Sequence, residues 1–306
     1  MKTVFLGTPE WAVPSLRSLL AAGIDVAAVV TNPDRPAGRG MKLQPSPVKR
    51  AAAEAGIEVL QPASAKGPEL AAAMTDIAPD VAVVVAYGRI LPGALLEIPP
   101  HGFVNVHFSL LPAYRGAAPV QRAVMDGLDT TGVSIMVLTE GMDEGPVLAS
   151  ESVPVGPDET AGEVGERLAV IGAGILVPAL TAYVTGELAP VPQDDERATY
   201  APKVTPEEAR LDWSGRAETI ANMVRGLNPA PGAWTMLGDE RVKLWRARPS
   251  GDRGLRPGEL LAADALFAGT GAGAVVVEEA QVAGKKRMSG LEMARGLRLA
   301  PGAGFE

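Results

Sequence analysis

Short apolar runs alternate with helix-compatible segments over the first 190 residues of the chain. Each run is four to six residues long and apolar at nearly every position, which predicts strands buried on both faces. Such strands separated by helices predict a doubly wound α/β domain built on a mostly parallel sheet. The predicted strands are Thr3–Leu6, Val26–Val30, Val81–Ala86, Phe103–Val106 and Val133–Leu138, with one antiparallel strand around Pro146–Val153. The predicted helices are Ala12–Ala22, Val48–Ala55 and Ala118–Met125.

The pattern changes near residue 190. Residues 186–208 are polar and contain four prolines, which indicates a connection between domains. Beyond a helical segment, brief strand-like runs are separated by turn residues, a pattern typical of a small β barrel. We predict an α/β domain over 1–189, a linker over 190–208 and a barrel domain over 209–306. The helix is Ala217–Gly226, and the strands are Trp234–Leu237, Arg241–Ala247, Gly258–Leu261, Ala274–Val277 and Gln281–Val282.

The longest uncharged stretch, Leu168–Val184, is shorter than the roughly 20 residues that span a bilayer. Because it also contains two glycines and a proline, we interpret it as a helix packed on the sheet. The first apolar run stops at a turn after six residues, too soon for a signal peptide. The chain has no cysteine, which excludes disulfides and thiolate sites and fits a reducing compartment. We expect a cytoplasmic protein without membrane attachment.

The charge is divided unevenly along the chain. The net charge of −8 argues against a general nucleic-acid binder. Residues 1–208, however, carry 14 basic and 25 acidic side chains, whereas residues 209–306 carry 14 and 11. Within the acidic half, residues 31–50 have five basic side chains and one acid. Such asymmetry suggests a polyanion partner, although a mildly basic domain and a solvated loop explain the counts equally well.

Candidate chemistry begins where the fourth predicted strand ends. Asn105 and His107 are two residues apart, so their side chains point to the same side of that strand. Open α/β sheets bind ligands at the carboxyl ends of their strands. An amide beside an imidazole suits a carbonyl oxygen that gains negative charge during attack. A histidine alone in a strand is usually a core residue, and it is the neighbouring amide that favours function here.

A second polar segment, residues 141–146, follows the strand Val133–Leu138. It places Asp143 between glycines, which is typical of a turn and also of a backbone that passes close to a ligand. If this loop folds back on His107, the carboxylate can orient the imidazole and hold a water that relays protons.

Five segments carry a resemblance to a known family. The H-x-S-L-L-P motif at 107–112, followed by the aspartate loop, resembles folate-dependent formyltransferases. The R-P-A-G-R-G insertion at 35–40 and the A-G-K-K-x-M-S sequence at 283–289 narrow the resemblance to the methionyl-tRNA formyltransferases. The similarity covers essentially the whole chain and includes Val85–Pro92.

The resemblance implies a formyltransferase variant of the Rossmann fold with an OB-like C-terminal barrel. It implies transfer of a formyl group from 10-formyltetrahydrofolate, bound as a co-substrate, to the α-amine of methionine on initiator methionyl-tRNA. Asn105, His107 and Asp143 would be the catalytic residues, and no metal would be needed. Folate contacts would come from Ser109, Leu110, Leu111, Pro112, Arg89, Ile90, Leu91 and the backbone near Glu140.

The resemblance also implies that the basic insertion enters the acceptor end of tRNA. The predicted tRNA contacts are Arg35, Arg39, Lys42, Lys285, Lys286 and Arg287, with further phosphate contacts from Arg241, Lys243, Arg246 and Arg248. No long amphipathic segment offers an interface between subunits, so a monomer is expected. Trp11 and Phe108 are candidates for the methionine pocket, and core packing explains them equally well.

Three other functions each account for part of the sequence. A formyltransferase acting on a small amine, such as glycinamide ribonucleotide or an amino sugar, does not need the basic insertion or a second domain. A non-catalytic RNA-binding barrel does not need Asn105, His107 and Asp143. A nicotinamide enzyme would carry a G-x-G-x-x-G sequence after the first strand, and none is present there.

Overall fold

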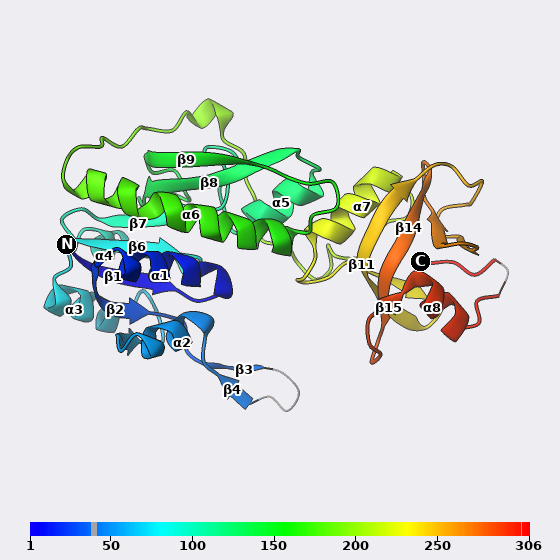
Figure 1. Ribbon diagram of the computed structural model, residues 1–306, viewed down its shortest axis with the longest axis horizontal. Helices are drawn as coiled ribbons and strands as arrows, with labels where there is room; N and C mark the ends of the chain where they lie inside the picture. Colours follow the sequence, from blue (N-terminus) through cyan, green and yellow to red (C-terminus); the bar gives the residue numbers. More distant parts are fainter. Residues whose placement is uncertain (38–41, 301) are drawn as a thin grey trace. The chain divides into compact units, whose positions relative to one another are not determined.

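The computed structural model describes residues 1–37, 42–300 and 302–306, which form two compact units (Figure 1). The N-terminal unit comprises the described parts of 1–117, 132–153 and 165–201. The C-terminal unit comprises 118–131, 154–164 and 202–306. The chain therefore passes between the units several times. The predicted domain boundaries at residues 189 and 209 stay a prediction.

The N-terminal unit is built on a seven-stranded sheet with the order β5-β2-β1-β6-β7-β8-β9. Neighbouring strands from β5 to β7 pair in parallel, which confirms the mostly parallel α/β fold. The strands are β1 (Lys2–Gly7), β2 (Asp25–Val30), β5 (Glu58–Leu60), β6 (Val81–Val85), β7 (Phe103–His107), β8 (Thr130–Val137) and β9 (Val147–Pro154).

The direction of β8 was predicted wrongly. The sequence placed the strand Val133–Leu138 among the parallel strands, but β8 runs antiparallel to β7, with His107 opposite Ser134 and Val104 opposite Val137. A parallel pair needs a crossover that returns over the sheet. The helix between these strands, α5 (Pro119–Met125), belongs to the C-terminal unit, so it makes no such crossover.

Helices cover both faces of this sheet. On one face, Ser18 in α1 donates a hydrogen bond to the Ala173 carbonyl in α6, and Gly172 of α6 lies against Val106 and Val133 (Figure 1). On the other face, α3 and α4 bury their apolar side chains against β1 and β6. The helices are η1 (Glu10–Ala12), α1 (Val13–Ala21), α2 (Pro47–Glu54), α3 (Pro68–Ile77), α4 (Gly93–Leu96), α6 (Ala161–Val184) and η2 (Asp195–Arg197).

Helix α6 contains the long uncharged stretch noted in the sequence and begins earlier, at Ala161. By length and composition it is the one described helix that could cross a membrane. Its glycine contacts with β7 and β8, and the burial of Leu168, Leu176 and Leu180, show that one side of it packs inside the N-terminal unit.

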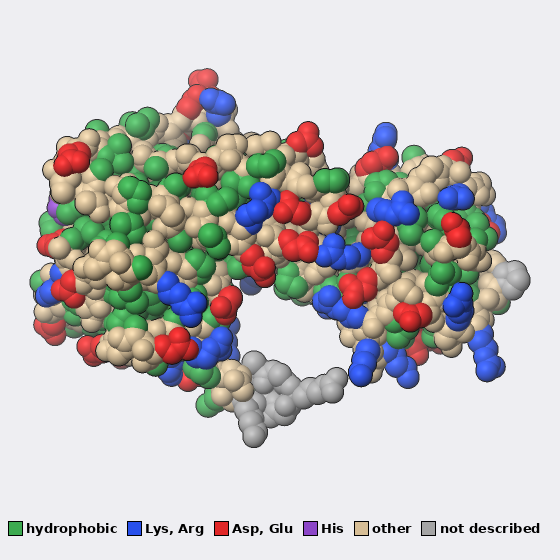
Figure 2. Space-filling view, in the orientation of Figure 1, with side chains coloured by type: hydrophobic (Ala, Val, Ile, Leu, Met, Phe, Trp, Pro, Cys, Tyr) green, Lys and Arg blue, Asp and Glu red, His purple; other side chains and the backbone are tan. Residues whose placement is uncertain are grey.

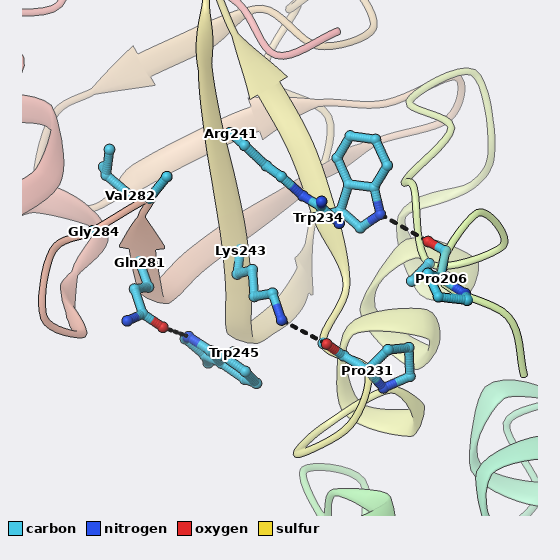
Figure 3. Close-up of a pocket in the computed structure, with 12 residues that line it drawn as sticks. Pro206, Pro231, Trp234, Arg241, Lys243, Trp245, Gln281, Val282 and Gly284 are labelled. Carbon is cyan, nitrogen blue, oxygen red and sulfur yellow. Dashed lines mark hydrogen bonds between the residues drawn. The ribbon is translucent and has the colours of Figure 1, made fainter. Parts of the chain in front are cut away.

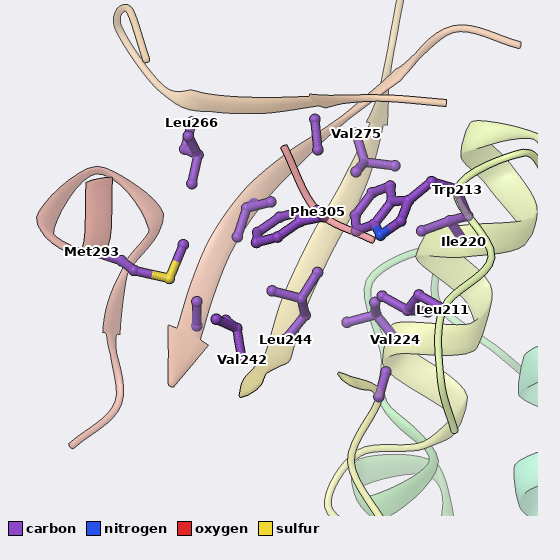
Figure 4. Close-up of a cluster of buried hydrophobic side chains, with 14 of the residues drawn as sticks. Leu211, Trp213, Ile220, Val224, Val242, Leu244, Leu266, Val275, Met293 and Phe305 are labelled. Atoms are coloured by element: carbon purple, nitrogen blue, oxygen red, sulfur yellow. The ribbon is translucent and has the colours of Figure 1, made fainter. Parts of the chain in front are cut away.

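The C-terminal unit contains a curled antiparallel sheet with the order β10-β11-β14-β13-β12, and β15 pairs with β14. This confirms the predicted small barrel-like domain. Its core gathers apolar side chains from the sheet and from α7 and α8, with Trp213 stacked on Phe305 at 5.1 Å (Figure 4). The elements are α7 (Ala217–Gly226), β10 (Trp234–Leu237), β11 (Glu240–Ser250), β12 (Leu260–Ala262), β13 (Leu266–Gly269), β14 (Ala274–Val282), β15 (Met288–Ser289) and α8 (Gly290–Gly296).

The segment predicted as a linker has structure of its own. Val191 forms a bridge with Val147 of β9, and Tyr200 forms a bridge with Arg115. Residues 190–201 therefore lie along the N-terminal unit, and the chain enters the C-terminal unit at Pro202.

Candidate active site

Asn105 and His107 lie on β7, whose five residues are all buried. Phe103, two residues before Asn105, packs in the core between the sheet and α3 and α4. Because side chains alternate along a strand, Asn105 and His107 continue on this same face toward the carboxyl end of β7. Among the described residues, the amide of Asn105 makes no hydrogen bond, although the residue is only 9% exposed. Its hydrogen-bonding groups are therefore not used by the part of the chain that the structure describes.

One ring nitrogen of His107 is hydrogen-bonded, and the other faces a carboxylate. Its Nε2 lies 2.9 Å from the backbone oxygen of Tyr114, and its Nδ1 lies 3.7 Å from Oδ2 of Asp143. A carbonyl oxygen only accepts hydrogen bonds, so Nε2 carries a hydrogen. Nδ1 then carries no hydrogen in the neutral ring and faces the Asp143 carboxylate.

Asp143 reaches His107 because the loop between β8 and β9 folds back along the sheet. Its Oδ2 accepts a hydrogen bond from the backbone N–H of Gly116 at 2.8 Å. Gly116 has φ +119°, and a Cβ there would meet the carbonyl of Ala201, so only glycine fits. The amide that anchors the carboxylate thus depends on a glycine four residues after the H-x-S-L-L-P segment.

The backbone of Asp143 is held by Gln193, a residue that the sequence did not single out. Asp143 has φ +53°, a left-handed conformation that costs a residue with a side chain about 1–3 kcal/mol. The Gln193 amide donates to the Asp143 carbonyl at 2.8 Å and to the Gly145 carbonyl at 2.7 Å. Gln193 lies in a proline-rich segment without periodicity, so no signal in the sequence indicated this contact.

Arg115, also missed, fixes Gln193. Its guanidinium is 2% exposed and donates two hydrogen bonds to Oε1 of Gln193, at 3.0 and 2.9 Å, and one to Asp195 at 2.7 Å. Burial lowers the pKa of Arg115, but hydrogen bonds to Asp195 and Tyr200 outweigh it and raise the pKa above its ordinary value. The side chain is therefore charged, and Asp143 is positioned through a chain of partly buried contacts.

We predict that Gln193→Glu lowers kcat by about tenfold to a hundredfold, because displacement of a catalytic group by about 1 Å has effects of that size. Glutamate still accepts from Arg115 but cannot donate to Asp143 and Gly145. Steady-state kinetics should show a fall in kcat with KM almost unchanged, and a shifted pH profile. Glu196→Gln, an exposed change in the same segment, is the matched control. A lower melting temperature with normal kcat would contradict this role.

The predicted folate contacts occupy three loops of the N-terminal unit, after β6, β7 and β8. Ser109 is fully buried and donates to the Ala113 carbonyl at 2.6 Å, while Leu110, Leu111 and Pro112 are partly exposed. The N–H of Leu111 donates to Ser134 of β8. Ser109 thus shapes the loop, and the three residues after it present the surface.

A second loop follows β6, and the third, which carries Glu140, follows β8. Ile90 is 73% exposed, unusual for a large apolar side chain, whereas Leu91 is buried. Arg89 donates to Asn32 and to the carbonyls of Pro62 and Ala63, so its guanidinium braces neighbouring loops. The side chain of Glu140 lies beside Gly93 at the start of α4. The folate assignments of all three loops stay predictions.

The basic insertion forms a two-stranded ribbon, β3 (Arg35–Ala37) and β4 (Lys42–Gln44), where the sequence predicted only a loop. Arg35 is exposed on it. Arg39 and the side chain of Lys42 lie outside the described residues. Lys49 donates to Asp34 at 2.7 Å and, with Gln61, lowers the pKa of that carboxyl. Lys49 therefore braces the base of the ribbon.

Of the predicted basic residues of the C-terminal unit, Arg241, Lys243, Arg246 and Arg248 lie on β11, and the other three lie in the hairpin between β14 and β15. Lys285 and Lys286 are exposed, and Arg287 is stacked on Trp245 at 3.8 Å and paired with Glu279. Figure 2 shows Lys and Arg side chains projecting from this unit among acidic ones. Trp11 and Phe108 contact each other edge to face at 5.9 Å, and their assignment to a methionine pocket stays a prediction.

Two family models match the chain in succession. The one described as formyl transferase matches residues 1–180, and the one described as the formyl transferase C-terminal domain matches residues 203–298. The fold is also similar to that of a HypX protein from Aquifex aeolicus, solved with tetrahydrofolic acid, with a TM-score of 0.67 and 19% identity over 98% of this chain and 48% of that one. It is similar to a sugar 3N-formyltransferase, WlaRD, with a TM-score of 0.68 and 15% identity over 94% and 99%. The fold is thus that of the formyltransferases.

Curated relatives narrow this class. The methionyl-tRNA formyltransferase of Streptomyces griseus is 51% identical over 99% of this chain and 98% of its own. That of Heliobacterium modesticaldum is 46% identical over the full length of both chains. The chain belongs to the methionyl-tRNA formyltransferase family, as its sequence motifs predicted.

Proposed function

We propose that this chain transfers the formyl group of 10-formyltetrahydrofolate to the α-amine of methionine on initiator methionyl-tRNA, in the cytoplasm. The observation that carries the catalytic assignment is the convergence of Asn105, His107 and Asp143, with the imidazole 3.7 Å from the carboxylate. They lie at the carboxyl end of β7, the edge at which open α/β sheets bind ligands. Tetrahydrofolic acid in the similar HypX structure supports a reduced folate as the donor.

The reaction joins the amine nitrogen to the formyl carbon and breaks the bond from that carbon to the folate nitrogen. Attack converts the formyl oxygen into an oxyanion. The unpaired amide of Asn105 is suited to donate to this oxygen, because it needs no rearrangement to do so. A donor already in place contributes more in a water-poor site than in water.

Proton transfer is a separate part of the reaction. The attacking amine loses one proton, and the leaving folate nitrogen gains one. Nδ1 of His107 is the basic atom of the pair, since Nε2 already carries a hydrogen toward Tyr114. The imidazolium formed there faces Asp143, and its positive charge also stabilises the oxyanion. Asp143 is proposed to accept the proton through water when the amine is not in direct contact with the ring.

The proposal is tested by incubating the protein with 10-formyltetrahydrofolate and one amine at a time. We expect formylation of charged initiator tRNA, and rates lower by orders of magnitude with free methionine, glycinamide ribonucleotide or an amino sugar. Mass spectrometry of the aminoacyl ester would identify the product. Efficient transfer to one of the small amines, with none to the tRNA, would replace the proposed acceptor.

A further inference from the structure

A cavity of about 460 Å³ lies on the C-terminal unit, beside β10 and β11 (Figure 3). All the residues that line it belong to this unit. Its walls join two indole rings, two prolines and two cations: Trp234, Trp245, Pro206, Pro231, Arg241 and Lys243. Apolar rings beside cations are the surface that nucleotides bind, with the base against the rings and the phosphate at the cations.

The walls are held in place by contacts of their own. The indole N–H of Trp234 donates to the Pro206 carbonyl, and that of Trp245 donates to Gln281, each at 3.0 Å (Figure 3). The guanidinium of Arg241 lies 3.9 Å from the centre of the Trp234 ring. An arginine stacked in this way keeps its N–H groups directed outward, where they can bind an anion.

The cations around the cavity lack matching negative charge. Within the described part of the chain, neither Arg241 nor Lys243 has a carboxylate partner, and Arg287 has only Glu279, at 3.7 Å. Burial lowers the pKa of Lys243, and the charges of Arg241 and Arg287 lower it further. These cations repel one another, so an anion between them would be favourable.

We propose that this cavity binds one unpaired nucleotide, its base against the indole and proline rings and its phosphate at Arg241 and Lys243. Its volume is within the range of about 300–1,000 Å³ for small-molecule sites, and larger than a phosphate alone requires. The inference rests on the proposed function for the nature of the partner, an RNA. The same chemistry is present in a free nucleoside monophosphate.

The chain has four tryptophans, so indole N–H resonances can report on the cavity. We expect adenosine monophosphate and a single-stranded oligoribonucleotide to shift the resonances of Trp234 and Trp245, and to leave those of Trp11 and Trp213 in place. Shifts with the oligonucleotide alone assign the site to RNA. Equal shifts with inorganic phosphate identify an anion site without base recognition and overturn the proposal, as does the absence of shifts.

A matched pair of variants separates the cavity from the general charge of the unit. Arg253, like Arg241, is an arginine stacked on an aromatic ring of this unit, Phe267 at 4.1 Å, but it does not line the cavity. Arg241→Gln should weaken binding of the oligoribonucleotide about tenfold and reduce the salt slope by about one. Arg253→Gln should change the affinity by less than about twofold. Equal losses in the two variants would overturn the proposal.

The proposal and the proposed function fail in different ways. If the unmodified protein formylates charged tRNA but adenosine monophosphate leaves all four indoles unchanged, only the nucleotide site is wrong. If no formylation occurs and the indoles still shift, the reaction is wrong and the site stands.

Discussion

Replacing Asp143 with asparagine should lower the rate of formyl transfer by about 10²- to 10⁴-fold, the range that general acid–base groups contribute. Asparagine has the same shape and can still accept from the Gly116 N–H. It carries no charge, so the imidazolium of His107, 3.7 Å away, loses its counterion. Single-turnover formylation of charged tRNA measures this effect separately from product release.

Glu144→Gln is the matched control for Asp143→Asn. Glu144 is an exposed carboxylate on the same loop, so its loss changes the loop's net charge by the same amount. We expect its rate within about twofold of the unmodified protein, as for surface charges in general. Near-normal turnover by Asp143→Asn, or equal losses in both variants, would contradict the role given to this carboxylate.

Asn105→Ala should lower kcat by about 10²- to 10³-fold, the effect of removing one oxyanion-hole donor. The amide has no hydrogen-bond partner among the described residues, so its removal leaves no buried group unpaired. The melting temperature should therefore change little. Kinetic measurements should show KM for the folate nearly unaltered, since the contact strengthens only as the oxyanion forms.

The rate and stability of Asn105→Ala can be compared with those of His107→Ala. The histidine variant also removes the donor to the Tyr114 carbonyl, so it should cost stability as well as rate. A variant at Asn105 that loses stability and keeps its rate would show that the amide serves the fold.

Much of the N-terminal sheet could be predicted because its information is local. Apolar runs of four to six residues marked β1, β2, β6 and β7 to within one or two residues. The two-residue spacing of Asn105 and His107 placed them on one face of a strand, as β7 shows. A continuous apolar run indicates a buried segment, and burial is the property that these four strands have in common.

What could not be predicted depends on contacts between distant segments. The direction of β8 follows from where α5 packs, which no pattern within α5 records. Gln193 is 50 residues from Asp143 and lies among prolines, so its role is visible only once both loops are placed. The cavity of the C-terminal unit likewise joins Pro206 to Gln281.

The segment that carries Gln193 sets the minimum length of a fragment that could catalyse the reaction on its own. A protein cut at residue 189 would retain every strand of the sheet, together with Asn105, His107 and Asp143. It would lack Gln193, whose side chain donates a hydrogen bond to the Asp143 carbonyl. The buried guanidinium of Arg115 would also lose its hydrogen-bond acceptors. A minimal enzyme, or a chimera with a different RNA-binding module, should therefore be joined beyond Ala201, because the residues before that junction complete the proposed reaction centre.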